Sequence, residues 1–434
     1  MKRIIVVMFT ALAAGALFAQ EVTLSGELKT GFYIEQETIG NDEPVAKGGM
    51  TNNDGDSGVG QGRLRLDFHS TYGNMGLRVR FQVEPPGPKD QGPFVPTWNF
   101  AYAYGNLFND QLTISAGLMG ESPWGTGGPR LRSEPETREY IAYNELTGEP
   151  YTAVEGLVGI RFEYKPAFIP GFNIGFVLNQ PDQVVIDTNK QEFLDMVGES
   201  VIGAAFESDY FAVRVGYRFD SEADAYPRTN MNEGSRLTYR IEERALGKLV
   251  DGMQIWLNGD YYGIECEKQL IEWKENGETF QKKIGVGEYF KNWLYWLWDT
   301  DHFIAKLDVG FGIYKSYNNE NLKPTERQEY QSLEFLPAFY YKFFDNLLQF
   351  GVGFGFGMEF GPGKTYKDSP YQYISVEPQI RLNMGDNAFI AAVYAYTDKY
   401  SWWDKEKMPS LPDSIKEGDK SVKHSVNIRA VYKF

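Results

Sequence analysis

The 434-residue chain has few of the residues that hold metals, form disulfides or bind nucleic acid. Its one cysteine, Cys266, excludes an intrachain disulfide framework and any site built from several cysteines. Its 43 Lys and Arg residues stand against 59 Asp and Glu, a net charge of −16, whereas a nucleic-acid binder carries a clustered basic excess. We therefore expect no metal site, no cofactor and no nucleic-acid partner.

Long apolar runs are confined to the first 20 residues, MKRIIVVMFTALAAGALFAQ. Two basic residues precede an apolar stretch that ends near Ala19, which is the pattern of a cleaved secretory signal peptide. Residues 1–19 are therefore predicted to be the signal peptide and residues 20–434 the exported protein. The exported part has a charge of −18, because two of the 43 basic residues leave with the signal.

After this segment no window of 18 apolar residues occurs, which excludes helical membrane spans. Disorder is also excluded, because 42% of the residues are hydrophobic and 15% are aromatic. The remaining route of this exported chain into a membrane is a β-barrel.

Apolar and polar side chains alternate along many segments, as in RLRLDFHS (63–70) and GLRVRFQVE (76–84). Each segment places leucine, valine or phenylalanine on one face and mostly charged or polar side chains on the other. In a soluble sandwich the charged face meets water, whereas in a transmembrane barrel the apolar face meets lipid and the charges face a wet lumen. Alternation alone fits both.

The lengths of the connections between strands distinguish a soluble sandwich from a transmembrane barrel. Short turns alternate with long loops from end to end of the chain, which is typical of outer-membrane barrels. The strand-like segments are 22–34, 62–72, 76–84, 98–105, 111–119, 156–165, 171–178, 199–208, 210–219, 235–242, 253–262, 290–298, 302–314, 332–343, 347–360, 371–382, 388–397 and 422–434. The sequence therefore predicts one all-β, transmembrane, antiparallel up-and-down β-barrel of 16–18 strands, with short periplasmic turns and long external loops. Sixteen is the alternative because 98–105, 199–208 and 235–242 show the weakest pattern.

The last segment, VKHSVNIRAVYKF, ends on Phe434, with Tyr432 in phase behind it. It resembles the terminal strand of bacterial outer-membrane barrels, and the architecture of the whole chain is similar to that of porins, including those of the spirochaete type. The resemblance implies that the barrel-assembly machinery reads Tyr432 and Phe434 as an assembly signal. It also implies an outer-membrane location in contact with outer-membrane lipid. The oligomeric state is left open, with a homo-oligomer among the alternatives.

Applied strand by strand, the alternation predicts a basic inner wall. The predicted pore-lining residues are Arg63, Arg65, Asp67, Arg78, Arg80, Glu84, Arg161, Arg214, Arg218, Arg236, Arg240, Lys306 and Asp308. The same face carries Lys29, Lys165, Lys342, Arg381, Lys423, Arg429 and Lys433, and the acidic Glu27, Glu163, Glu242, Asp260, Glu334 and Glu377. Together these are 17 basic against nine acidic residues. Pairing with neighbouring carboxylates is an alternative reading for any one arginine, but it does not explain the excess.

The third long loop, 120–155, is a candidate constriction, because in porins the third external loop commonly folds into the lumen. Its prolines and glycines disfavour a strand and suit a compact loop. Its candidate residues are Arg130, Arg132, Glu134, Glu136, Arg138 and Glu139. The alternative is that this loop caps the barrel from outside.

These patterns favour a porin for passive diffusion of small hydrophilic solutes, whose selectivity comes from pore width and charged rings. The alternative is a barrel-anchored surface adhesin or antigen with a closed or loop-plugged lumen. We expect no enzymatic activity. A barrel hydrolase needs a histidine beside a serine or aspartate, and only His69, His302 and His424 are present.

Overall fold

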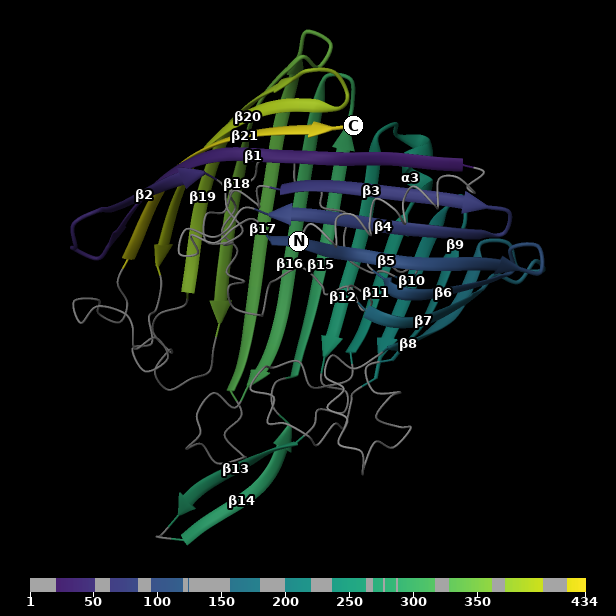
Figure 1. Ribbon diagram of the computed structural model, residues 1–434. Coiled ribbons are helices and arrows are strands. Elements are labelled where there is room, and N and C mark those ends of the chain that lie inside the picture. The colour runs from purple at the N-terminus through teal and green to yellow at the C-terminus, as the bar shows by residue number, and fades with distance from the viewer. Residues whose placement is uncertain are drawn as a thin grey trace.

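The chain forms a closed, antiparallel, up-and-down β-barrel (Figure 1). The computed structural model describes residues 21–50, 63–84, 95–119, 124, 157–179, 200–219, 236–262, 268–275, 278–285, 288–316, 328–360, 371–400 and 420–434. Of its 21 strands, β2, β13 and β14 lie outside the barrel, which leaves 18 strands in the wall. Of the predicted 16–18 strands, the upper number is therefore correct.

The wall strands follow one another in chain order. The first ten are β1 (Glu21–Ile39), β3 (Arg63–Tyr72), β4 (Met75–Glu84), β5 (Val95–Leu107), β6 (Leu112–Met119), β7 (Leu157–Tyr164), β8 (Phe172–Asn179), β9 (Val201–Glu207), β10 (Phe211–Arg218) and β11 (Arg236–Glu243). The other eight are β12 (Met253–Tyr262), β15 (Glu288–Asp299), β16 (Phe303–Ser316), β17 (Gln328–Phe343), β18 (Leu348–Phe360), β19 (Tyr371–Asn383), β20 (Ala388–Tyr400) and β21 (Lys420–Lys433). Every predicted segment, the three weakest included, is one of these strands.

The barrel closes where β1 pairs with both β3 and β21. At this seam Gly26 and Phe434 exchange two backbone hydrogen bonds, of 2.7 Å and 3.0 Å. The Phe434 ring covers Gly26 so closely that a Cβ there would come within 3.0 Å of the ring and of the Arg65 carbonyl oxygen. The absence of a side chain at position 26 thus lets the chain end lie flat on the first strand.

The tight connections lie at one rim. Two of them place three successive residues in the left-handed region, namely Phe108–Asp110 and Phe344–Asn346. Asn and Asp tolerate this conformation better than other non-glycine residues, so the sequences FND and FDN suit these turns. The β11–β12 connection contains the one-turn helix α3 (Ala245–Leu249).

Two predicted long loops contain strands. Within 35–61, β1 continues to Ile39 and β2 (Val45–Met50) pairs with it, because the edge of β1 beyond the end of β3 would otherwise be unpaired. Within 263–289, β13 (Lys268–Glu275) and β14 (Glu278–Gly285) pair only with each other. This hairpin lies beyond the wall in Figure 1.

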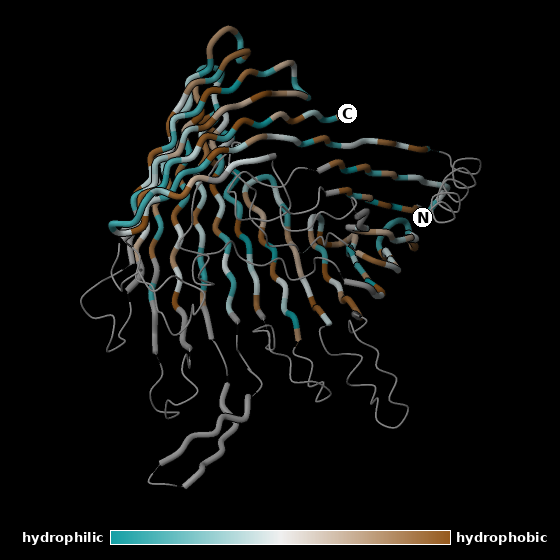
Figure 2. Tube along the Cα trace, turned by 60° about the vertical axis from the view of Figure 1, so that its left-hand side comes forward, coloured by the Kyte–Doolittle hydropathy of each residue, from teal (hydrophilic) through white to brown (hydrophobic). Residues whose placement is uncertain are grey.

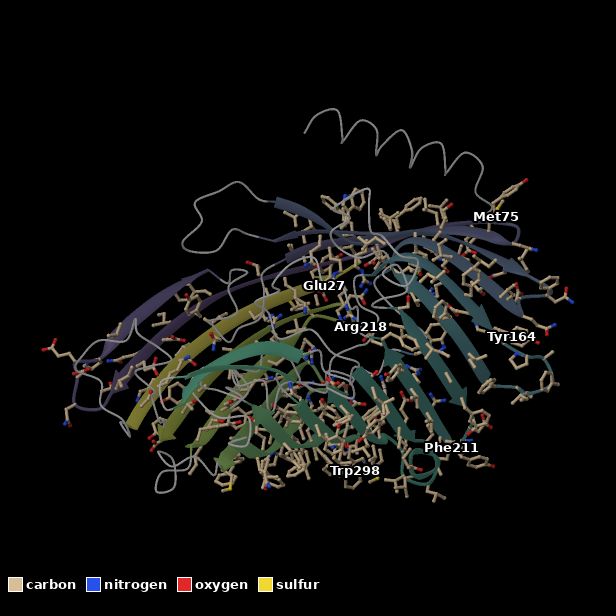
Figure 3. The ribbon with its side chains drawn as sticks, turned by 90° about the horizontal axis from the view of Figure 1, so that it is seen from below. Glu27, Met75, Tyr164, Phe211, Arg218 and Trp298 are labelled. Atoms are coloured by element: carbon tan, nitrogen blue, oxygen red, sulfur yellow. The ribbon has the colours of Figure 1, made fainter. Side chains whose placement is uncertain are left out.

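Burial is inverted relative to a soluble protein. Apolar side chains on the outer face are exposed, as with Phe350 (56%) and Ile374 (55%), whereas inner-face carboxylates such as Glu334 (0%) and Asp260 (1%) are buried. Figure 2 shows the alternation along the strands. Seen from below, Glu27 and Arg218 lie inside the wall, while Phe211 and Trp298 point outward (Figure 3). The exterior is therefore suited to lipid and the interior to polar groups.

Candidate functional site: the barrel lumen

The inner face carries the predicted charged residues wherever the structure describes their side chains. Among the pore-lining set these are Arg65, Asp67, Arg78, Arg80, Arg161, Arg214, Arg218, Arg240, Lys306 and Asp308. The side chains of Arg63, Glu84 and Arg236 lie outside the described residues, as do Arg130, Arg132, Glu134, Glu136, Arg138 and Glu139. Lys165 and Lys433 lie at the short-turn rim and are exposed.

Strands β3 and β4 place three arginines side by side on the wall. Arg65 donates to Gln82 Oε1 from Nε (3.0 Å) and Nη2 (2.8 Å). Arg80 is paired with Asp67 across the two strands. Among the described residues Arg78 contacts no carboxylate, and its Nη1 lies 3.5 Å from the Tyr102 hydroxyl. Pairing with a carboxylate therefore accounts for Arg80 but, among the described residues, not for Arg78.

An aromatic surface lies next to these arginines. The Arg80 and Arg78 guanidinium carbons lie 4.6 Å and 5.5 Å from the centre of the Phe100 ring. Further along, Arg161 lies 5.6 Å from the Tyr102 ring centre and pairs with Glu163 at 2.7 Å. Cation–π contacts of this kind hold a guanidinium in place while leaving its charge available to a solute.

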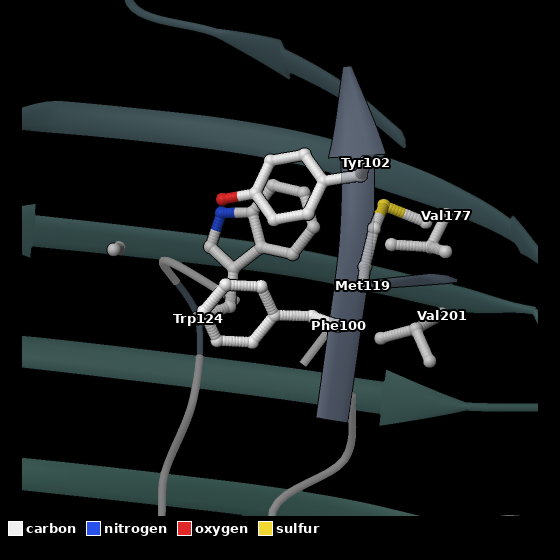
Figure 4. Packing of buried hydrophobic residues seen from close by; sticks show 7 residues of the cluster. Phe100, Tyr102, Met119, Trp124, Val177 and Val201 are labelled. Atoms are coloured by element: carbon white, nitrogen blue, oxygen red, sulfur yellow. The ribbon is translucent and has the colours of Figure 1, made fainter. Parts of the chain in front are cut away.

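Trp124 lies against the same wall and is fully buried. It packs with Phe100 and Tyr102 of β5 and with side chains of β6, β8 and β9, as Figure 4 shows. Its indole Nε1 donates to Asn173 Oδ1 at 3.2 Å. Trp124 belongs to the candidate constriction loop, 120–155. At this residue the loop contacts the inner wall, next to the aromatic rings that Arg78 and Arg80 contact.

Two glycines shape the notch that receives the indole. A Cβ at Gly175 or Gly203 would come within 3.0 Å of Trp124 atoms. At Gly203 the three nearest atoms all belong to Trp124, whereas at Gly175 the backbone oxygen of Phe162 is also too close. Gly203 is therefore the position at which an added side chain would act mainly on the tryptophan.

A second apolar group, mostly aromatic, covers the wall from β12 to β19. It comprises Trp256, Trp293, Tyr295, Leu336 and Tyr373, of which Trp293 and Tyr295 are stacked with ring centres 6.0 Å apart. The Tyr373 hydroxyl donates to the buried Glu334 carboxylate at 3.1 Å. Lys306 lies 5.8 Å from the ring centre of Tyr340. The lumen wall is thus mixed, with charged and aromatic surfaces side by side.

Sequence reasoning missed several inner-face charges, among them Glu207 on β9, which pairs with Arg214 at 2.6 Å, Glu35 and Lys291. Glu35 is 2% exposed and pairs with Lys423 at 3.0 Å, but it lies beyond the predicted end of the first strand. Lys291 is buried on the inner face of β15, where aromatic residues on both faces hide the alternation. The inner-face residues of β1, such as Glu27 and Lys29, have odd numbers. Continuing this alternation past residue 34 would have identified Glu35.

The histidines are dispersed. His69 Nε2 lies 2.9 Å from the Tyr104 hydroxyl on the inner wall, and His424 Nδ1 lies 2.7 Å from the Tyr394 hydroxyl on the outer face. Among the described residues, no group of three or more His, Cys, Asp or Glu side chains could hold a metal ion. In the same part of the chain, no helix has the length and hydropathy needed to cross a membrane.

The architecture and the inverted burial define a transmembrane β-barrel. No protein-family model and no curated protein matches the chain. Among solved structures it is similar to an anion-selective porin from Comamonas acidovorans, with 11% identity, 95% of this chain and 99% of that chain covered, and a TM-score of 0.47. It is also similar to OmpT, an outer membrane protein of Vibrio cholerae, with 13% identity, 95% and 97% coverage and a TM-score of 0.45.

Proposed function

We propose that the protein is an outer-membrane porin through which small hydrophilic solutes diffuse passively, without catalysis. The observation that carries the proposal is the closed 18-strand wall with an apolar exterior and an ionisable interior. Barrels of this size leave an aqueous channel unless something fills them. In this proposal the short-turn rim faces the periplasm, the exterior contacts outer-membrane lipid, and the barrel-assembly machinery inserts the chain.

Conductance in a planar lipid bilayer tests the proposal. The purified folded barrel should produce stepwise current increments, because each inserted pore adds one aqueous path across the membrane. A chain heated until it no longer shows the mobility of a folded barrel is the control and should produce none. Folded protein that inserts into liposomes yet gives no steps would contradict the porin function.

A second candidate function is a closed barrel that anchors surface loops as an adhesin or antigen. The buried apolar side chains of the inner wall favour it, because Trp293 is only 1% exposed and Leu336 is fully buried. The wall at this level is therefore covered rather than open to water. The bilayer experiment separates the two functions, since a filled lumen carries no steady current.

We further propose that the loop 120–155 narrows the lumen and that Trp124 holds it against the wall. Replacing Trp124 with alanine removes a fully buried side chain, a change that costs about 3–5 kcal/mol in protein cores. The released loop should raise single-channel conductance and add open-channel noise.

Gly203→Val provides the complementary variant. It fills the notch from the wall side and leaves the tryptophan in the sequence, so it should reproduce the larger and noisier currents of Trp124→Ala. Gly105→Val, at a position where an added Cβ meets nothing within 4 Å, is the matched control and should conduct like the wild type. Equal currents from all four proteins would show that Trp124 does not set the width of the pore.

A further inference from the structure

One hydrogen-bonded pair of side chains reaches across three strands of the inner wall. Tyr104 of β5 and His69 of β3 are not on neighbouring strands, because β4 lies between them. The Tyr104 side chain crosses β4 over Gly76, where an added Cβ would come within 3.0 Å of three Tyr104 atoms. The Tyr104 hydroxyl lies 2.9 Å from His69 Nε2. The absence of a side chain at Gly76 thus lets the tyrosine and the histidine meet on the lumen side of β4.

Arg78 lies beside this pair, near the short-turn rim. The register places it directly opposite His69 on β3 and opposite Tyr102 on β5. Among the described residues, the polar and aromatic partners of Arg78 are the Phe100 ring, 5.5 Å from its guanidinium carbon, and the Tyr102 hydroxyl, 3.5 Å from Nη1. Neither partner is a carboxylate. Both Arg78 and His69 are half-buried, so a solute in the lumen can reach them.

Charged and titratable groups from four strands, its own included, surround His69. They are Glu21 of β1, Asp67 of β3, Arg78 and Arg80 of β4, and Tyr102 and Tyr104 of β5. Asp67 is paired with Arg80, so it offsets little of the charge beside the histidine. The residues directly opposite His69 are Thr23 on β1 and Arg78 on β4. A protonated His69 therefore adds its charge to that of Arg78 with no carboxylate opposite either group among the described residues.

Protonation also reverses the hydrogen bond between His69 and Tyr104. In the neutral tautomer with its hydrogen on Nδ1, Nε2 accepts from the Tyr104 hydroxyl. A protonated imidazole carries hydrogen on both nitrogens, so Nε2 then donates to the Tyr104 oxygen. The hydroxyl hydrogen is thereby free to turn into the lumen. One proton thus adds a positive charge and releases a hydrogen-bond donor beside Arg78.

We propose that Arg78, His69 and Tyr104 form a proton-dependent subsite for the oxyanion group of a small solute, either a carboxylate or a tetrahedral group such as sulfate or phosphate. The inference rests on the proposed channel function and makes it specific. The Arg78 guanidinium supplies charge and paired donors at any pH, whereas the charge of His69 and the Tyr104 donor are added in acid. An anion bound here pauses in the lumen, so the subsite should saturate, and at lower concentrations in acid.

Block of chloride current at two pH values tests the subsite. Sulfate and oxalate are suitable probes, because both remain dianionic from about pH 8 to about pH 5, the range in which histidine changes its charge. With chloride as the charge carrier, the half-blocking concentration of either anion should fall about tenfold on acidification of the wild-type channel, a typical coupling between two binding events. Stronger block by sulfate than by oxalate would assign a tetrahedral oxyanion, and the reverse a carboxylate.

Three variants separate the roles of the residues. H69Q can still hydrogen-bond Tyr104 but cannot gain a charge, so its half-blocking concentration should stay at the wild-type value of the higher pH under both conditions. Y104F keeps its ring over Gly76 and should retain only the part of the pH effect that comes from the histidine charge. R78Q should raise the half-blocking concentration about tenfold or more at both pH values, because charge-assisted hydrogen bonds to the anion are lost.

The matched control is H424Q. His424 also contacts a tyrosine, with Nδ1 2.7 Å from the Tyr394 hydroxyl, but on the outer face of the barrel. H424Q should therefore keep the full pH effect of the wild type. A pH effect that persists in H69Q, or that is lost equally in H69Q and H424Q, would overturn the role of His69 in the subsite.

The subsite and the channel function fail in different ways. Chloride currents that neither sulfate nor oxalate blocks at either pH would overturn the subsite while leaving the channel intact. If no channel current occurs, the channel function fails. Calorimetric titration of the folded barrel with sulfate at the lower pH then decides the subsite by itself, with no heat of binding overturning it.

Discussion

Exchanging Arg78 and Arg80 for glutamate should shift the lumen strongly toward cations. The two arginines stand side by side over Phe100, next to the wall on which Trp124 is anchored. The double exchange alters the charge of this part of the lumen by four units. The same exchange leaves Asp67 beside a second carboxylate, because Arg80 is its partner across the strands.

Coulomb's law sets the size of this effect. Four unit charges about 10 Å from a passing ion change its energy by roughly 1.6 kcal/mol in water, or about 0.6 kcal/mol after screening at 0.1 M salt. An energy change of that size raises the concentration of cations in the lumen about threefold and lowers that of anions by the same factor. The cation-to-anion permeability ratio should therefore rise roughly eightfold. The low-dielectric wall increases the effect, because it confines field lines to the lumen.

The reversal potential in a salt gradient measures this ratio. R78K/R80K keeps both charges and should show nearly the wild-type reversal potential, which separates charge from loss of the guanidinium shape. Both variants must show heat-modifiable mobility before they are compared, because a misfolded barrel also loses selectivity. A reversal potential that stays constant in folded R78E/R80E would place the constriction elsewhere in the lumen.

The strand pattern was predictable because each wall strand has lipid on one side and the lumen on the other. This environment imposes a period of two on the sequence, so the pattern located all 18 wall strands. The pattern was weak in three segments, of which 98–105 is one, and strands β4 and β5 show the reason there. The register shifts between Arg80 and Phe81, and aromatic side chains occupy the inner face of β5. A register shift interrupts the alternation that identifies a strand from sequence alone.

The contacts inside the lumen were not predictable, because they join residues that are far apart in the chain. Trp124 lies on glycines of β8 and β9 that are 51 and 79 positions further along, and nothing in the local sequence marks them as its receptor. Arg214 of β10 lies opposite Arg240 of β11 because of a register that the intervening loop does not reveal. Sequence analysis therefore predicted many of the side chains that face inward but not how their charges are grouped.

Replacing Gly26 with valine should prevent efficient closure of the barrel. The new side chain would collide with the Phe434 ring and with the Arg65 carbonyl oxygen, on the two neighbours of β1 at the seam. Overpacking of this kind costs about 1–3 kcal/mol, which is roughly a fivefold or greater loss in the closed form. Deletion of Phe434 should act in the same direction, because it removes both backbone hydrogen bonds to Gly26.

These two variants separate packing at the seam from recognition of the chain end by the assembly machinery. Gly26→Val leaves Tyr432 and Phe434 unchanged, so an assembly signal read only at the C-terminus would be intact. Folding of purified chains into liposomes, without any assembly machinery, should still be reduced for both variants relative to Gly105→Val, measured as the fraction of heat-modifiable barrel. If both fold into liposomes as well as the control, and only the Phe434 deletion fails in cells, Phe434 acts as a recognition signal and not as a structural part of the seam.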